Sequence, residues 1–90
     1  VFMFIDSLID AGVKNGLTAD EAMTLAVQTV IGSAEMVQNS EKSTSELIMS
    51  VCSKGGTTIE AVKTLEENNF RGIVGEAVDA CVKRSQELSK

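Results

Sequence analysis

The chain has 90 residues, of which 43% are hydrophobic, and its net charge is −5. A domain of this length buries only about 60–65% of the surface that its unfolded chain exposes, so its own core is small. The eight basic residues are scattered rather than clustered, which argues against binding to nucleic acid, because phosphate requires a basic face. Histidine is absent, which excludes a Ser-His-Asp triad and removes the commonest metal ligand.

The cysteines and the first residues bear on the compartment of the protein. Cys52 and Cys81 lack CxxC spacing, so neither a zinc site nor a disulfide framework is predicted, and reduced thiols in a cytoplasmic protein are expected. The apolar stretch 1–5 is too short to span a membrane or to form the core of a signal peptide, and no membrane partner is expected. Because the chain starts at Val1 in the middle of a helical pattern, we expect an N-terminal portion to precede it.

Apolar residues at helical spacing predict two helices in the first half of the chain. The first covers residues 1–15, is apolar on nearly all sides, and ends where Gly16 can occupy the position after the C-cap. Thr18 and Glu21 have the spacing of a capping box, which opens a second helix that extends to about residue 39.

Three shorter or more polar helices follow. Ser43 and Glu46 form a second capping box before a helix that ends near Cys52, and Thr57 with Glu60 predicts a third box before a helix that ends near residue 68. The last helix, from residue 69 or 70, carries one apolar side on which Cys81 is expected to be buried: Phe70, Ile73, Val74, Ala77, Cys81 and Leu88.

These elements predict an all-α fold, a bundle of about five helices that forms one domain over residues 1–90. The apolar stripes are broader than one small core can cover. We therefore expect the helices to interlock with those of a second subunit.

The loop between the third and fourth predicted helices is the strongest candidate site. Gly55 and Gly56 allow close approach to the main chain, a helix start follows at once, and Ser53, Thr57 and Thr58 add hydroxyl groups. Such a loop suits a carboxylate or phosphate. The alternative is a plain turn, in which the glycines end one helix and a threonine caps the next. No GxGxxG motif follows a strand, so the chain carries no dinucleotide-binding fingerprint and no cofactor-binding residues.

At this loop the sequence resembles a known family. The segment LIMSVCSKGGTTIEAVKTLE, residues 47–66, is similar to the signature segment of pyrroline-5-carboxylate reductases. Other segments along the chain resemble helices of the same family, namely residues 4–6 with 11–17, residues 26–34 (AVQTVIGSA), residues 70–71, residues 77–78, and residues 83–85 with 87–88. Two departures stand in or near the loop: Lys54 replaces the usual proline, and Ser50 replaces a common aspartate or asparagine.

The resemblance implies a C-terminal helical dimerisation domain that follows a Rossmann domain for NADH or NADPH, the latter absent from this chain. It implies reduction of pyrroline-5-carboxylate to proline by homodimers, which also form rings in the family. By position, Ser53, Gly55, Gly56 and Thr57 would bind the substrate carboxylate. Thr58 would also line the site and act as the catalytic residue, with its hydroxyl at the ring nitrogen; no metal is implied.

Two alternatives stay open at this point. One is a helical dimerisation module without a catalytic role, in which the loop is only a turn. The other is the helical domain of another Rossmann-type dehydrogenase that acts on a hydroxy acid. Enzymes of that kind usually place a lysine general acid inside a helix, and no such lysine is evident here.

Overall fold

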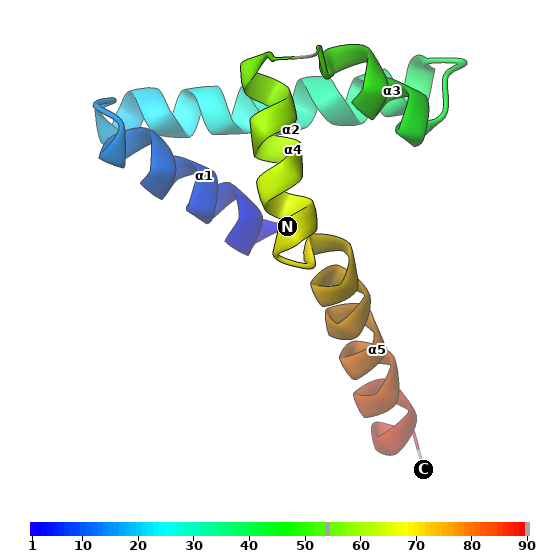
Figure 1. Cartoon of the computed structure of the whole chain (residues 1–90). Helices are drawn as coiled ribbons and strands as arrows, with labels where there is room; N and C mark the ends of the chain where they lie inside the picture. Colours follow the sequence, from blue (N-terminus) through cyan, green and yellow to red (C-terminus); the bar gives the residue numbers. More distant parts are fainter. Residues whose placement is uncertain (54, 90) are drawn as a thin grey trace. The chain divides into compact units, whose positions relative to one another are not determined.

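The computed structural model describes residues 1–53 and 55–89, and every regular element in this part of the chain is an α-helix (Figure 1). The helices are α1 (Phe2–Lys14), α2 (Ala19–Asn39), α3 (Thr44–Val51), α4 (Thr57–Glu67) and α5 (Phe70–Leu88). The predicted all-α fold class is thereby confirmed. Within the described residues, none of the helices combines the length and the apolar character that crossing a bilayer demands.

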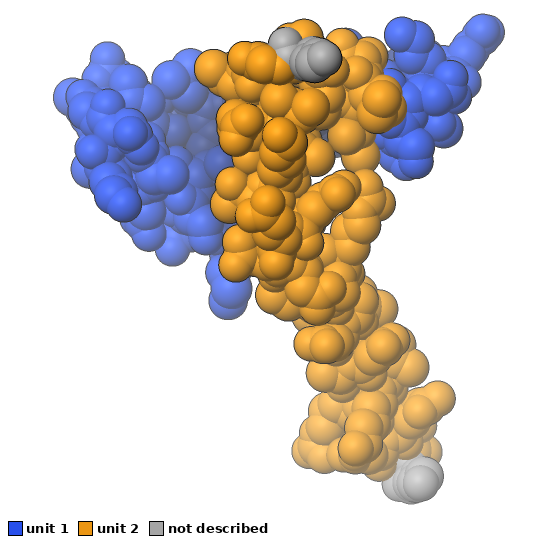
Figure 2. Space-filling model, in the orientation of Figure 1, with its two compact units in different colours: residues 1–47 blue, residues 48–90 orange. Residues whose placement is uncertain are grey.

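The chain divides into two compact units, Val1–Leu47 and Ile48–Lys90, and the division falls inside α3 (Figure 2). The first unit contains α1 and α2, which contact each other, and the second contains α4 and α5. Each unit is described by itself below.

The turn between α1 and α2 follows the sequence signals closely. The Leu17 N–H donates to the Gly12 carbonyl at 3.0 Å and the Gly16 N–H donates to the Val13 carbonyl at 3.1 Å, which is the Schellman arrangement. Gly16 has a φ of 106°, an angle that glycine adopts without steric cost. The prediction that Gly16 follows the C-cap of the first helix is confirmed.

Two of the three predicted capping boxes form. The Glu21 N–H donates to Thr18 Oγ1 at 3.2 Å, and the Thr18 N–H donates to Glu21 Oε1 at 2.9 Å. The same reciprocal pair joins Ser43 and Glu46, at 3.1 and 3.0 Å, ahead of α3. Each box gives two backbone N–H groups at a helix start a hydrogen-bond acceptor and so fixes where α2 and α3 begin.

The third predicted box, between Thr57 and Glu60, is wrong. Thr57 is already the first residue of α4, so the N-cap is Gly56, which has an extended backbone and no side chain that could cap the helix. The position three residues after this cap is Ile59, which has no polar side chain to complete a box. The start of α4 therefore lacks a side-chain cap.

The core of the first unit is small. Among the described residues only Ala22 and Ala26 are buried, with 2% and 5% of their surface exposed. A Cβ on Gly12 would lie 3.0 Å from the Ala22 Cβ, so the two helices touch where both side chains are small. Beside this contact lies a shallow, mostly apolar hollow of about 160 Å³, lined by Leu8, Gly12, Leu17, Ala22, Leu25, Ala26 and Thr29.

Candidate functional site

The loop ahead of α4 is a tight turn. The Gly56 N–H donates to the Ser53 carbonyl at 2.9 Å, and Gly55, the residue before it, has a φ of 75°. A hydrogen bond between the first and fourth residues with a positive φ at the third is the geometry of a turn that favours glycine at that third position. Nothing lies within 4 Å of where a Cβ on Gly55 would be, so lack of space does not explain the glycine. Its positive φ does, because side chains disfavour that backbone conformation.

Gly56 lies close against Ser53, a contact that the sequence did not reveal. A Cβ at this position would lie 2.5 Å from Ser53 Oγ and 3.1 Å from the Ser53 carbonyl oxygen. The space beside Gly56 is thus filled by Ser53 rather than left open to a ligand. The Ser53 hydroxyl therefore lies beside Gly56, the N-cap of α4.

The start of α4 offers hydrogen-bond donors to an anion. The first N–H groups of an α-helix have no partner inside the helix, and here these belong to Thr57, Thr58 and Ile59. Together with the helix dipole they favour a negative group at this end. Gly56 contributes no such donor, because its N–H is bonded to Ser53. The sequence analysis took Thr57 as the cap and so placed the helix start one residue later than it lies.

The two threonines occupy successive positions on α4. Their side chains therefore point about 100° apart around the helix axis, so one ligand group cannot meet both hydroxyls in the same way. Both residues are exposed, as is Ser53, whereas Gly56 is half-buried. All the residues predicted to bind substrate lie in this turn and the first two positions of the helix.

Acidic groups near this end do not form a metal centre. Within the described residues no group of three or more Cys, Asp or Glu side chains is arranged to hold a metal ion. The nearest acid, Glu60, lies 3.8 Å from the Lys63 ammonium, and both side chains are largely exposed. An exposed ion pair of this kind contributes little to stability.

A second surface feature is the broad apolar stripe of α5. No residue of this helix is buried, and its large apolar residues are between 40% and 69% exposed: Phe70, Ile73, Val74, Val78, Val82 and Leu88. Cys81 is exposed as well, so the prediction that it is buried does not hold within a single chain. Apolar side chains that recur three and four residues apart along 19 residues form one continuous face.

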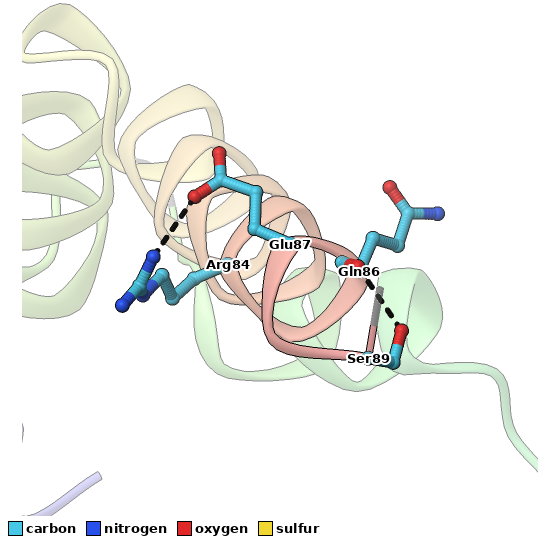
Figure 3. A network of polar contacts seen from close by, with 4 residues as sticks. All are labelled: Arg84, Gln86, Glu87 and Ser89. Atoms are coloured by element: carbon cyan, nitrogen blue, oxygen red, sulfur yellow. Dashed lines mark hydrogen bonds and ion pairs between the residues drawn. The ribbon is translucent and has the colours of Figure 1, made fainter.

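The polar contacts at the far end of α5 stay within the helix (Figure 3). Arg84 Nη1 pairs with Glu87 Oε2 at 3.1 Å, and Ser89 Oγ donates to the Gln86 carbonyl at 3.0 Å. These bonds order the last turn without tying it to another element. The apolar face beside them is exposed in the single chain.

The first helix carries a similar apolar tip. Val1, Phe2 and Met3 have 87%, 91% and 82% of their surfaces exposed. Exposed apolar surface of this extent, with two buried residues among those that the structure describes, is typical of an association domain. The fold and the site together define an all-helical domain with exposed apolar helix faces and an uncapped helix start behind a glycine turn.

Comparison with known proteins identifies the family to which this all-helical domain belongs. The family model for pyrroline-5-carboxylate reductase dimerisation matches residues 1–88. The chain is 48% identical to pyrroline-5-carboxylate reductase of Escherichia coli (strain K12) over 90 residues, which are 100% of this chain and 34% of that protein. It is 46% identical to the reductase of Glycine max over 89 residues, covering 99% of this chain and 32% of that protein.

Solved structures agree with this result. Plasmodium falciparum pyrroline carboxylate reductase, solved with NADP bound, superposes with a TM-score of 0.96 at 40% identity, covering 99% of this chain and 34% of that one. The reductase of Coxiella burnetii gives a TM-score of 0.94 at 42% identity, covering 99% of this chain and 33% of that one. The chain belongs to the pyrroline-5-carboxylate reductase dimerisation family. It spans about a third of the length of the relatives that it matches.

Proposed function

We propose that this chain is the dimerisation and substrate-binding part of an oxidoreductase that reduces pyrroline-5-carboxylate to proline with NADH or NADPH. The carrying observation is that a match to the family over residues 1–88 coincides with a glycine turn that leaves the start of α4 uncapped. The relatives are about three times as long, and one of them was solved with NADP bound. This supports a Rossmann domain outside these 90 residues that binds the cofactor. The family match favours this interpretation over the two alternatives that the sequence left open.

The substrate carboxylate is proposed to lie at the start of α4. The N–H groups of Thr57 and Thr58, which have no partner inside the helix, would donate to it. The Ser53 hydroxyl, held at the helix start by the turn, would donate as well. Gly55 and Gly56 act by shaping this turn. A substitution that prevents either glycine from adopting its conformation in this turn would move Ser53 away from the helix start.

Thr58 is proposed to act at the reacting C=N bond. Bound NAD(P)H supplies the hydride that the imine carbon accepts, and the ring nitrogen must then hold a proton to become the amine of proline. A neutral hydroxyl can both donate and accept a hydrogen bond, so Thr58 can hold this nitrogen and pass a proton from water to it. The Thr57 hydroxyl, about 100° away around the helix, would contact the carboxylate side of the ring instead.

The protein is proposed to act as a homodimer, with rings of dimers as a further level of assembly. The apolar faces of α1 and α5 are the surfaces that a second copy would cover, because they are exposed in the single chain. The free cysteines fit a reducing compartment, and the cytoplasmic location stays a prediction.

The proposal is tested with a chimera in which this chain replaces the matching segment of the Escherichia coli reductase, which is 48% identical to it. Purified chimera is assayed for pyrroline-5-carboxylate-dependent oxidation of NADPH and of NADH. We expect turnover with at least one of the two. Thr57→Ala is the matched control for Thr58, since it removes a hydroxyl from the neighbouring position and should cause the smaller loss. A folded, dimeric chimera without activity would instead support a dimerisation module that has no catalytic role.

A further inference from the structure

The first unit has an apolar hollow that α1 and α2 leave uncovered. The two helices lie close together at the turn that joins them and separate toward Val1 (Figure 1). Gly12 meets Ala22 near this turn, and the mostly apolar hollow of about 160 Å³ lies beside their contact. An apolar space of roughly 150 Å³ accommodates a group of the size of benzene. The hollow therefore has room for one large apolar side chain.

A second hollow continues this surface along α2. It has a volume of about 400 Å³, and Leu17 and Leu25 line both hollows. Leu25 is nevertheless 55% exposed. Asp20 and Glu21 also line the second hollow, so a pair of acidic residues stands at this end. We call the two hollows together the groove of the first unit.

The charges of the two units differ. Residues 1–47 contain seven acidic and two basic side chains, whereas residues 48–90 contain six of each. Two copies that met through their first units would bring together two negatively charged surfaces, which repel each other. A contact between the first unit of one copy and the second unit of another avoids this repulsion, because the formal charges of the second unit cancel.

α5 in the second unit carries the features that complement the groove. Its side chains Ile73, Val74 and Val78 are 55%, 48% and 57% exposed. Arg71 lies three residues before Val74 on the same side of the helix, and it forms no ion pair among the described residues. An apolar row beside an arginine matches an apolar groove that has carboxylates at one end.

We propose that the apolar face of α5 of one copy lies in the groove of the first unit of a second copy, and that a twofold axis repeats this contact. The inference rests on the proposed function, in which the chain acts as a homodimer. The match to a dimerisation family favours a second copy, rather than another protein, as the partner. Each dimer then contains two identical contacts, which cover both the exposed face of α5 and the groove.

The test is a cycle of charged variants, measured as the dimer dissociation constant in sedimentation equilibrium, with helix content followed by circular dichroism. Leu25→Glu places a carboxylate in the groove, and Val74→Lys places an ammonium group on the face of α5. Each single variant should associate at least about 10-fold more weakly than the unsubstituted chain. In the chain with both changes the new charges meet in each contact, so association should be at least about 10-fold tighter than the two single effects together predict.

Two further variants keep this cycle decisive. Val78→Lys repeats it one helical turn further along α5, and coupling of Leu25→Glu with either lysine variant supports the contact. Thr29→Glu replaces Leu25→Glu if the latter loses helix content, because Thr29 is an exposed residue of the same groove and glutamate favours a helix more than threonine does.

Gln38→Glu is the matched control, because it adds the same charge about 20 Å further along α2 and lines neither hollow. It should associate within about 3-fold of the unsubstituted chain and show no coupling with Val74→Lys. A contact of groove with groove, or of α5 with α5, would bring equal charges together and make the doubly changed chain weaker than either single variant. That result would overturn the inference, and so would an absence of coupling with both lysine variants.

A mixture separates a contact between copies from one within a single chain. The Leu25→Glu chain mixed with the Val74→Lys chain should form dimers more tightly than either chain alone, because one of the two contacts then contains neither change. No gain on mixing would assign the face of α5 to the groove of its own chain and overturn the inference. An unsubstituted chain that stays monomeric would overturn it as well. An inactive chimera, by contrast, refutes the reductase proposal and leaves these association measurements unchanged.

Discussion

Val74 stands near the centre of the apolar face of α5, and its replacement by aspartate is expected to dissociate the proposed dimer. In the single chain 48% of the Val74 surface is exposed. Neighbours at helical spacing on the same face, Phe70 and Val78, are 40% and 57% exposed. A second copy that covers this face would therefore bury roughly the remaining half of each side chain.

The magnitude follows from this exposed half. Full burial of an aliphatic side chain of this size contributes about 2 kcal/mol, so covering half of Val74 contributes about 1 kcal/mol. A twofold axis repeats each contact, which makes about 2 kcal/mol per dimer. Loss of this contribution alone lowers the association constant about 30-fold. The aspartate adds the cost of a desolvated charge without a partner, so 30-fold is the lower bound.

The assay is sedimentation equilibrium of the isolated chain over a concentration series, at constant salt. Gln86→Asp is the matched control, because it makes the same change of charge on the polar side of the same helix (Figure 3). The control should associate within about 3-fold of the unsubstituted chain. Equal dissociation constants for Val74→Asp and Gln86→Asp would refute the assignment of the α5 face to the dimer.

Three further results are expected. Thr58→Ala should lower the turnover number of the chimera about 100-fold in steady-state kinetics, and a loss confined to KM would contradict its action at the reacting bond. Hydrogen bonds with the backbone N–H of Thr18, and then with its hydroxyl, lower the pKa of Glu21 from its ordinary value of 4.5. The stability that this carboxylate contributes is therefore present above pH 4.5 and is lost as the pH falls below that value. Glu21→Gln should remove this pH dependence from the free energy of unfolding measured in urea across a pH series. Gly12→Ala places a Cβ 3.0 Å from a buried side chain of α2 and should cost about 1 kcal/mol in chemical denaturation, whereas Gly32→Ala, with nothing within 4 Å, should stabilise the chain by about 0.5–1 kcal/mol. A Gly12→Ala variant that is stabilised as much as Gly32→Ala would show that the contact between α1 and α2 does not depend on a small residue at position 12.

The start and end signals of the helices could be predicted where they are local. The two boxes opened by Thr18 and Ser43 and the turn at Gly16 depend on neighbours within a few residues, and all three are confirmed. The box at Thr57 matched the same pattern and failed, because the turn before it ends at Gly56 and leaves Thr57 inside the helix. A pattern of side chains does not reveal where the preceding turn stops.

Other features depend on contacts that a sequence does not display. Periodicity identified the apolar side of α5, yet it could not tell whether the same chain covers that side, and Cys81 is exposed. Gly56 lies close to the Ser53 side chain and Gly72 close to the Asn69 side chain, because each side chain reaches forward to the residue three positions later. The role of Thr58 rests on resemblance to a family rather than on any physical property of the residue alone.

The small core and the position of the proposed substrate turn both make this chain dependent on assembly in the proposed dimer. Only Ala22 and Ala26 are buried among the described residues, so in the proposed dimer most of the apolar surface of this chain would gain its stabilisation from association. When folding and assembly are coupled in this way, the free energy of the folded state depends on the concentration of the chain. The turn from Ser53 to Gly56 is held by contacts within four residues and can form in the single chain. The apolar face of α5, by contrast, is exposed in the single chain and would need a second copy to cover it. In the proposed function, a substrate site that depends on both parts would be complete only in the assembled protein, which would explain why one domain carries dimerisation and substrate binding together.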